Sequence, residues 1–91
     1  MPDARILIVE DDAIIGRHIQ VSLKRLGYDV AGVLLSGEDA VSQTMALYPD
    51  LILMDVSLAG EMDGIQAAGI IREKYNLPVV FLTAFADQST L

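Results

Sequence analysis

Acidic side chains at the ends of two apolar runs are the residues of this sequence best suited to chemistry. The run RILIVE (residues 5–10) ends in Glu10 and is followed by Asp11, and the run LILMD (51–55) ends in Asp55. A carboxylate that ends a buried strand is costly unless another group or an ion neutralises its charge. Carboxylate oxygens are also ligands that Mg²⁺ prefers. These acids are therefore candidates for a metal-supported site.

Three further polar residues are weaker candidates for functional roles. Asp12 fits the N-cap of a helix better than a metal ligand, since aspartate is among the preferred capping residues. Thr83 ends the apolar run PVVFLT (78–83), and threonine is common in strands, so its hydroxyl counts only together with the acids. His18 has no second ligand near it in the expected helix and is predicted to be a surface residue.

The elements that must position these residues alternate along the chain. Short apolar runs rich in β-branched residues predict strands, and apolar residues spaced three and four apart predict helices. Gly27 stands where a helix commonly ends in a left-handed residue, and Ser36 with Asp39 resembles a capping box. The predicted strands are residues 5–10, 28–33, 51–55 and 78–83, and the predicted helices are 12–26, 36–48 and 64–75, the first with an apolar face of Ile15, Ile19, Leu23 and Leu26.

Regular alternation of strand and helix with short connections predicts an α/β fold, in which helices cover both faces of a parallel sheet. In such a doubly wound sheet, ligands bind outside the carboxyl ends of the strands, where the strand order reverses. If the first strand is central and the third lies beside it, Glu10, Asp11 and Asp55 converge at that place. Like charges so close together require a cation. Mg²⁺ fits, because it takes one or two carboxylates and leaves positions for phosphate oxygens.

The composition limits the classes of function. A chain of 91 residues allows one small domain. Its 13 acidic and 6 basic residues give a net charge of −7, which argues against direct nucleic-acid binding and favours a cation or a basic protein partner. The sequence has no cysteine and therefore no disulfide. It has neither the roughly 20-residue apolar run of a membrane helix nor a basic-then-apolar leader, so a cytoplasmic protein is expected.

The last predicted strand lacks a neighbour on one side. PVVFLT (78–83) would be an apolar edge strand without a charge, and natural sheets rarely leave such an edge bare. We therefore expect the fold to continue beyond Leu91 with at least one further strand and helix. The alternative is a homodimer in which a second copy of the chain covers this edge.

Three segments, in order, resemble the receiver domains of two-component response regulators, of the CheY-like kind. ILIVEDD (6–12) is similar to the family's first strand and acidic pocket, PDLILMDVSLAGEMDGIQAAGIIR (49–72) to its phosphoacceptor strand, loop and next helix, and LPVVFLTAFAD (77–87) to its fourth strand. The resemblance covers essentially all 91 residues. It implies a flavodoxin-like doubly wound sheet of strand order 2-1-3-4, in a receiver domain at residues 1–91 that lacks its fifth strand and last helix.

The same resemblance implies a role for each site residue. Asp55 would be the phosphoacceptor, taking a phosphoryl group from a histidine kinase or a phosphotransfer protein. Thr83 would hydrogen-bond the phosphoryl group through its hydroxyl, and Ala84 through its backbone N–H. The expected metal is Mg²⁺ or Mn²⁺, and the implied ligands are Glu10, Asp11, Asp55 and the backbone carbonyl of Ser57.

The implied function is that of a signalling domain rather than an enzyme. It would comprise self-phosphorylation, weak autophosphatase activity and a conformational switch for an effector domain in the parent chain. Three alternatives stay open. An Mg²⁺-dependent phosphohydrolase with an aspartyl nucleophile would usually carry a second aspartate where Ser57 stands. A flavin or nucleotide binder would need a phosphate-cradling loop where EDDA (10–13) stands. The third is a receiver-like interaction module that acts without phosphorylation.

Overall fold

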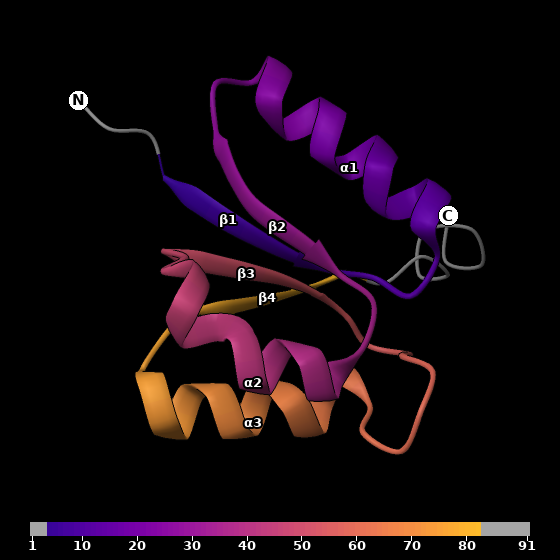
Figure 1. Ribbon diagram of the computed structural model, residues 1–91, viewed down its shortest axis with the longest axis vertical. Coiled ribbons are helices and arrows are strands. Elements are labelled where there is room, and N and C mark those ends of the chain that lie inside the picture. Colours follow the sequence, from indigo (N-terminus) through magenta and orange to yellow (C-terminus); the bar gives the residue numbers. More distant parts are fainter. Residues whose placement is uncertain (1–3, 83–91) are drawn as a thin grey trace, which may run out of the picture.

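Strand and helix alternate through the part of the chain that the computed structural model describes, residues 4–82 (Figure 1). The sequence predicted this alternation, and most boundaries differ from the predicted ones by one residue or two. The elements are β1 (Arg5–Val9), α1 (Ala13–Arg25), β2 (Asp29–Leu34), α2 (Gly37–Leu47), β3 (Leu51–Asp55), α3 (Gly64–Tyr75) and β4 (Val79–Leu82).

The strands form one parallel sheet in the order β2-β1-β3-β4, which confirms the predicted doubly wound order. The sheet separates two helical layers: α1 lies on one face, and α2 and α3 lie together on the other (Figure 1). Within the sheet Val9 is paired with Met54, and Asp55 is paired with Leu82. The carboxyl ends of β1, β3 and β4 therefore lie at the same edge of the sheet.

The core lies mainly between the sheet and the pair α2 and α3. Alternate residues of a strand point to the same face, so Leu7 and Val9 of β1 face the same layer as Ile52 and Met54 of β3. All of them are fully buried, together with Ile71 of α3. Burying a side chain of this size contributes about 1.5–3 kcal/mol. This packing fixes β1 beside β3, and with them the residues that follow each strand.

Helix α1 packs on the sheet differently from the sequence prediction. Ile15 and Leu26, which were predicted to share its apolar face, are 42% and 72% exposed, so this face is only partly covered among the described residues. The buried residue of this helix is Gly16, which lies against Val33 of β2: a Cβ on Gly16 would come within 2.9 Å of the Val33 Cγ1 atom. The missing side chain lets the helix approach β2 closely at Gly16, whereas Ile19 and Leu23 of the apolar stripe are half-buried.

The three helices begin at side-chain caps. Asp12 caps α1, as predicted, and Ser36 caps α2 through the Asp39 N–H at 3.1 Å. The reciprocal capping box lies at α3 instead, where Asp63 and Gln66 each accept the other's backbone N–H. Gly27 takes the predicted left-handed conformation, with φ +96°. These caps satisfy helix N–H groups that have no partner within the helix.

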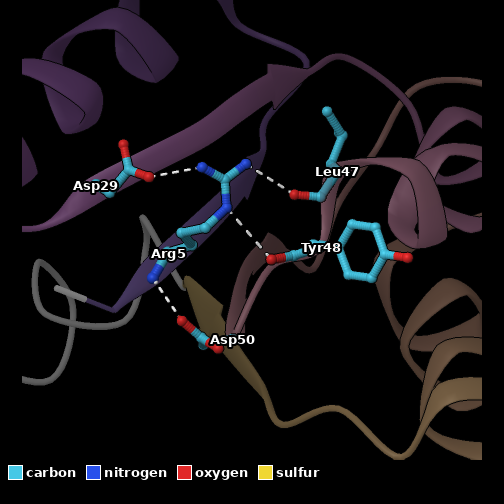
Figure 2. Close-up of polar contacts among 5 residues, drawn as sticks. All are labelled: Arg5, Asp29, Leu47, Tyr48 and Asp50. Atoms are coloured by element: carbon cyan, nitrogen blue, oxygen red, sulfur yellow. Dashed lines mark hydrogen bonds and ion pairs between the residues drawn. The ribbon is translucent and has the colours of Figure 1, made fainter. Parts of the chain in front are cut away.

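Arg5 begins β1, at the end of the sheet opposite Glu10, Asp11 and Asp55, and contacts residues of β2, of the end of α2 and of the loop before β3 (Figure 2). Its guanidinium forms an ion pair of 2.6 Å with Asp29 at the start of β2, and donates to the carbonyl oxygens of Leu47 (2.8 Å) and Tyr48 (3.3 Å) at the end of α2. Its backbone N–H donates to the Asp50 carboxylate at 2.8 Å, just before β3. Because α2 ends on this cation, the negative end of its dipole is neutralised.

No helix among residues 4–82 is both long and apolar enough to span a bilayer. The expected fifth strand and last helix lie outside the described residues.

Candidate metal centre

The carboxylates of Glu10, Asp11 and Asp55 lie together at the carboxyl edge of the sheet. Glu10 and Asp11 directly follow β1, and Asp55 is the last residue of β3, the strand paired with β1. One carboxylate oxygen from each of them lies within 4.8 Å of the other two. The sequence predicted this convergence, and the parallel pairing of β1 with β3 is its physical cause.

The three carboxylates differ in exposure and in hydrogen bonding. Glu10 is only 5% exposed, Asp55 is half-buried and Asp11 is exposed. Each accepts one backbone N–H among residues 4–82: Glu10 from Asp12 at 3.1 Å, Asp55 from Ser57 at 3.2 Å, and Asp11 from Ala59 at 3.2 Å. These bonds orient the side chains, and carboxylates retain further acceptor capacity for a ligand.

Glu10 has a strongly perturbed pKa. Burial raises the pKa of this carboxyl from 4.5 to about 7, because the charged form loses its hydration. The backbone N–H of Asp12 opposes that rise, and the neighbouring carboxyl groups of Asp55 and Asp11 add to it. Without a cation, the Glu10 carboxyl is therefore partly protonated near neutral pH, because its pKa is about 7.

The donor set fits a hard divalent cation. Three carboxylates converge there. Among residues 4–82 the only ion pair is that of Arg5 with Asp29, at the other end of the sheet, so no described lysine or arginine neutralises the cluster. Mg²⁺ binds oxygen ligands and keeps several waters or phosphate oxygens. The arrangement could hold such an ion beside Asp55 and leave the Asp55 oxygens able to react.

The side chains of the remaining predicted residues are not part of this carboxylate cluster, or the residues lie outside residues 4–82. Asp12 directs its Oδ1 to the N–H groups of Ile14 (2.9 Å) and Ile15 (3.2 Å), so it is a helix cap. Ser57 is exposed two residues after Asp55, and the ligand role of its carbonyl stays a prediction. His18 is exposed on α1, as expected for a surface residue. Thr83 and Ala84 lie outside the described residues.

Two residues that sequence reasoning missed support the site. The Ala59 N–H bonds Asp11 across 48 positions of sequence, and no local pattern signals such a bond. Gly64, the first residue of α3, is buried directly against the backbone of Asp55. Its sequence context, Asp63-Gly64 before a helix, suggested only a turn.

A four-stranded parallel sheet of order 2-1-3-4 with an acidic cluster at its carboxyl edge defines a doubly wound α/β domain whose carboxylates could hold a metal ion. Comparison with known families is more specific. Residues 6–91 match the model of the response regulator receiver domain. The chain belongs to this family, as the resemblance predicted.

Related proteins of known sequence agree with this assignment. The transcriptional regulatory protein PdtaR of Mycobacterium tuberculosis is 39% identical over 84 residues, which make up 92% of this chain and 40% of PdtaR. The DNA-binding response regulator MtrA of the same organism is 39% identical over 83 residues, 91% of this chain and 36% of MtrA. The chain thus spans about two fifths of the length of these curated relatives.

Solved structures show the same fold. The signal receiver domain of a modulated diguanylate cyclase from Desulfovibrio desulfuricans G20 has a TM-score of 0.87 at 39% identity, over 99% of this chain and 70% of that one. The N-terminal domain of a response regulator/sensory box/GGDEF three-domain protein from Carboxydothermus hydrogenoformans has a TM-score of 0.84 at 44% identity, over 96% and 70%. Both likenesses support the observed strand order and layers.

Proposed function

We propose that this chain is a phosphoacceptor receiver domain of a two-component system, which takes a phosphoryl group onto Asp55 in an Mg²⁺-dependent reaction. The observation that carries the proposal is the meeting of Glu10, Asp11 and Asp55 within 4.8 Å, in a chain of the receiver family. The proposed metal ligands are Glu10, Asp11, Asp55 and the Ser57 carbonyl.

The chemistry of the chain's own residues is simple. An Asp55 carboxylate oxygen forms a bond to phosphorus while the bond from phosphorus to the donor's histidine nitrogen breaks, and the imidazole keeps the electron pair of that bond. A bound Mg²⁺ would supply charge neutralisation between Asp55 and the phosphoryl oxygens. Glu10 and Asp11 would hold that ion. The Thr83 hydroxyl and the Ala84 N–H would then bind the phosphoryl oxygens.

The proposed partners follow from this reaction. The phosphodonor would be a histidine kinase or a phosphotransfer protein in the cytoplasm, and the reader an effector domain of the parent chain. The domain itself would show only self-phosphorylation and slow loss of its own phosphoryl group. Added negative charge and acceptor oxygens at Asp55 would bias the neighbouring loops toward a second conformation.

The test is an intact mass measurement after incubation with acetyl phosphate and Mg²⁺. We expect one phosphoryl adduct, absent in Asp55→Asn and absent when EDTA removes the metal. Asp12→Asn is the matched control: it removes a neighbouring acid but keeps a capping side chain, so the adduct should persist.

Two results would contradict the proposal. A folded chain that binds Mg²⁺ but never gains the adduct would indicate an interaction module that works without phosphorylation. A folded chain that does not bind Mg²⁺ would remove the metal centre itself.

A further inference from the structure

Gly64 lies so close to the backbone of Asp55, the candidate phosphoacceptor, that no residue with a side chain would fit at its position. A Cβ on this residue would overlap the Asp55 carbonyl oxygen, and would lie 2.9 Å from the Asp55 carbonyl carbon and 3.0 Å from the Val56 Cα. Gly64 is not in a left-handed conformation, unlike Gly27 and Gly60. Close approach of two backbones, and not an unusual φ angle, is therefore what demands glycine here.

Backbone and side-chain hydrogen bonds on either side of Gly64 in the sequence hold the first turn of α3 against the end of β3. The Gly64 N–H donates to the Val56 carbonyl at 3.0 Å. Behind it, Asp63 accepts the Gln66 N–H at 2.8 Å, and the Gln66 side chain accepts the Asp63 N–H at 3.0 Å. The capping box thus holds the N-terminus of α3 in place, and the contact of Gly64 with the Asp55 backbone makes the place of that backbone depend on where the helix begins.

The segment between Asp55 and Gly64 also contacts the candidate metal ligands. Its Ser57 N–H bonds Asp55, and its Ala59 N–H bonds Asp11. A shift of the helix end would therefore move the Asp55 main chain and both of these donors together. The spacing of the acidic cluster depends on where α3 begins.

We propose that Gly64 is a positioning residue, which sets the place of the Asp55 main chain and thereby the spacing of the Asp55 carboxylate from Glu10 and Asp11. The proposal rests on the proposed metal-dependent function of that site. A side chain at position 64 must push β3 and α3 apart, because both neighbouring groups are backbone and cannot turn aside. Metal binding then weakens in molecules that are still folded.

The test compares the Mg²⁺ affinity of folded wild type, Gly64→Ala and Ile71→Val by calorimetric titration. Ile71 is fully buried on the same helix, and losing one methyl group there costs about 0.5–1.5 kcal/mol of stability. We expect Gly64→Ala to lose at least about tenfold in Mg²⁺ affinity, a loss typical of groups that support metal ligands. Ile71→Val should keep its affinity within about twofold, because Ile71 lies seven residues, about two helical turns, after Gly64 on α3.

A second variant covers the case in which Gly64→Ala does not fold. Gln66→Ala removes only the acceptor of the Asp63 N–H, so it loosens the helix end without a clash or a change of charge. Its Mg²⁺ affinity should fall severalfold, whereas Ser36→Ala, which weakens the cap of α2, should leave it unchanged.

The outcomes separate this proposal from the proposed function. If wild type does not bind Mg²⁺, the proposed function fails and this proposal fails with it. If wild type binds Mg²⁺ and Gly64→Ala binds it equally well, the positioning role alone is refuted. When Gly64→Ala does not fold, an unchanged affinity in Gln66→Ala refutes it likewise.

Discussion

Replacing Glu10 by glutamine should stabilise the metal-free protein at neutral pH and weaken its metal site. Glutamine has the shape of the protonated glutamic acid and keeps an oxygen that can accept the Asp12 N–H. It removes the cost of ionising a carboxyl that is only 5% exposed and lies beside Asp11 and Asp55. The variant therefore separates the effect of the Glu10 charge on the stability of the fold from its effect on metal binding.

The magnitude follows from the pKa. In the folded protein the Glu10 carboxyl holds its proton up to about pH 7, whereas its ordinary value is 4.5. Between these values the folded state binds more protons than the unfolded state, so the free energy of unfolding of wild type falls as pH rises from 4.5 to about 7. The full loss is on the order of 3 kcal/mol above pH 7, and about 1 kcal/mol at pH 5. Glu10→Gln should not show this loss of stability, because glutamine does not ionise.

The assay is urea unfolding followed by far-ultraviolet circular dichroism at pH 5 to 8 in EDTA. The advantage of Glu10→Gln over wild type should grow across this range and level off above pH 7. Glu73→Gln, a change of the same kind at an exposed position on α3, controls for the loss of one negative charge and should show no such growth. Mg²⁺ at roughly 1,000 times its Kd should reverse the order, since it adds about 4.1 kcal/mol to wild type, which exceeds the loss of about 3 kcal/mol.

Two results would refute this reasoning. An advantage of equal size at pH 5 and pH 8 would show that Glu10 does not titrate in this window. An advantage no larger than that of Glu73→Gln would show that overall charge, and not burial at the cluster, carries the effect.

Two further predictions concern the frame of the fold. Arg5→Met should lower the free energy of unfolding by about 2 kcal/mol, because it removes a half-exposed ion pair with Asp29 and two hydrogen bonds to carbonyls at the end of α2. Urea unfolding measures this loss. A loss equal to that of Asp29→Asn alone would mean that the two hydrogen bonds to the carbonyls contribute nothing. Ser36→Ala should cost about 1 kcal/mol, since the Asp39 N–H loses its acceptor. Ser36→Asn, which restores an acceptor, should recover most of that loss, and equal stability of the two variants would argue against the cap.

Local pattern predicted most of the secondary structure, because strands and helices depend largely on residues near in sequence. Leu51 to Asp55 is a strand with the predicted bounds, and Asp12 and Ser36 are the predicted caps. The packing of α1 was harder to predict. Its predicted apolar face includes Ile15 and Leu26, yet both are exposed among the described residues, and the buried residue of the helix is Gly16. Periodicity tells which face of a helix is apolar, not how closely that helix can approach its sheet.

The sequence by itself determined which residues could form the site: acids at the ends of two apolar strands, in an α/β alternation whose parallel topology places those ends side by side. Tertiary structure decided the burial and the hydrogen-bond partners of each acid. Glu10 is buried and its pKa rises to about 7, whereas Asp11, the next residue, is exposed and held by Ala59 from a distant loop. Desolvation and bonds across 48 positions arise only when β1, β3 and the start of α3 are packed together. For the same reason, the contact of Gly64 with the Asp55 backbone could be found only in the folded chain.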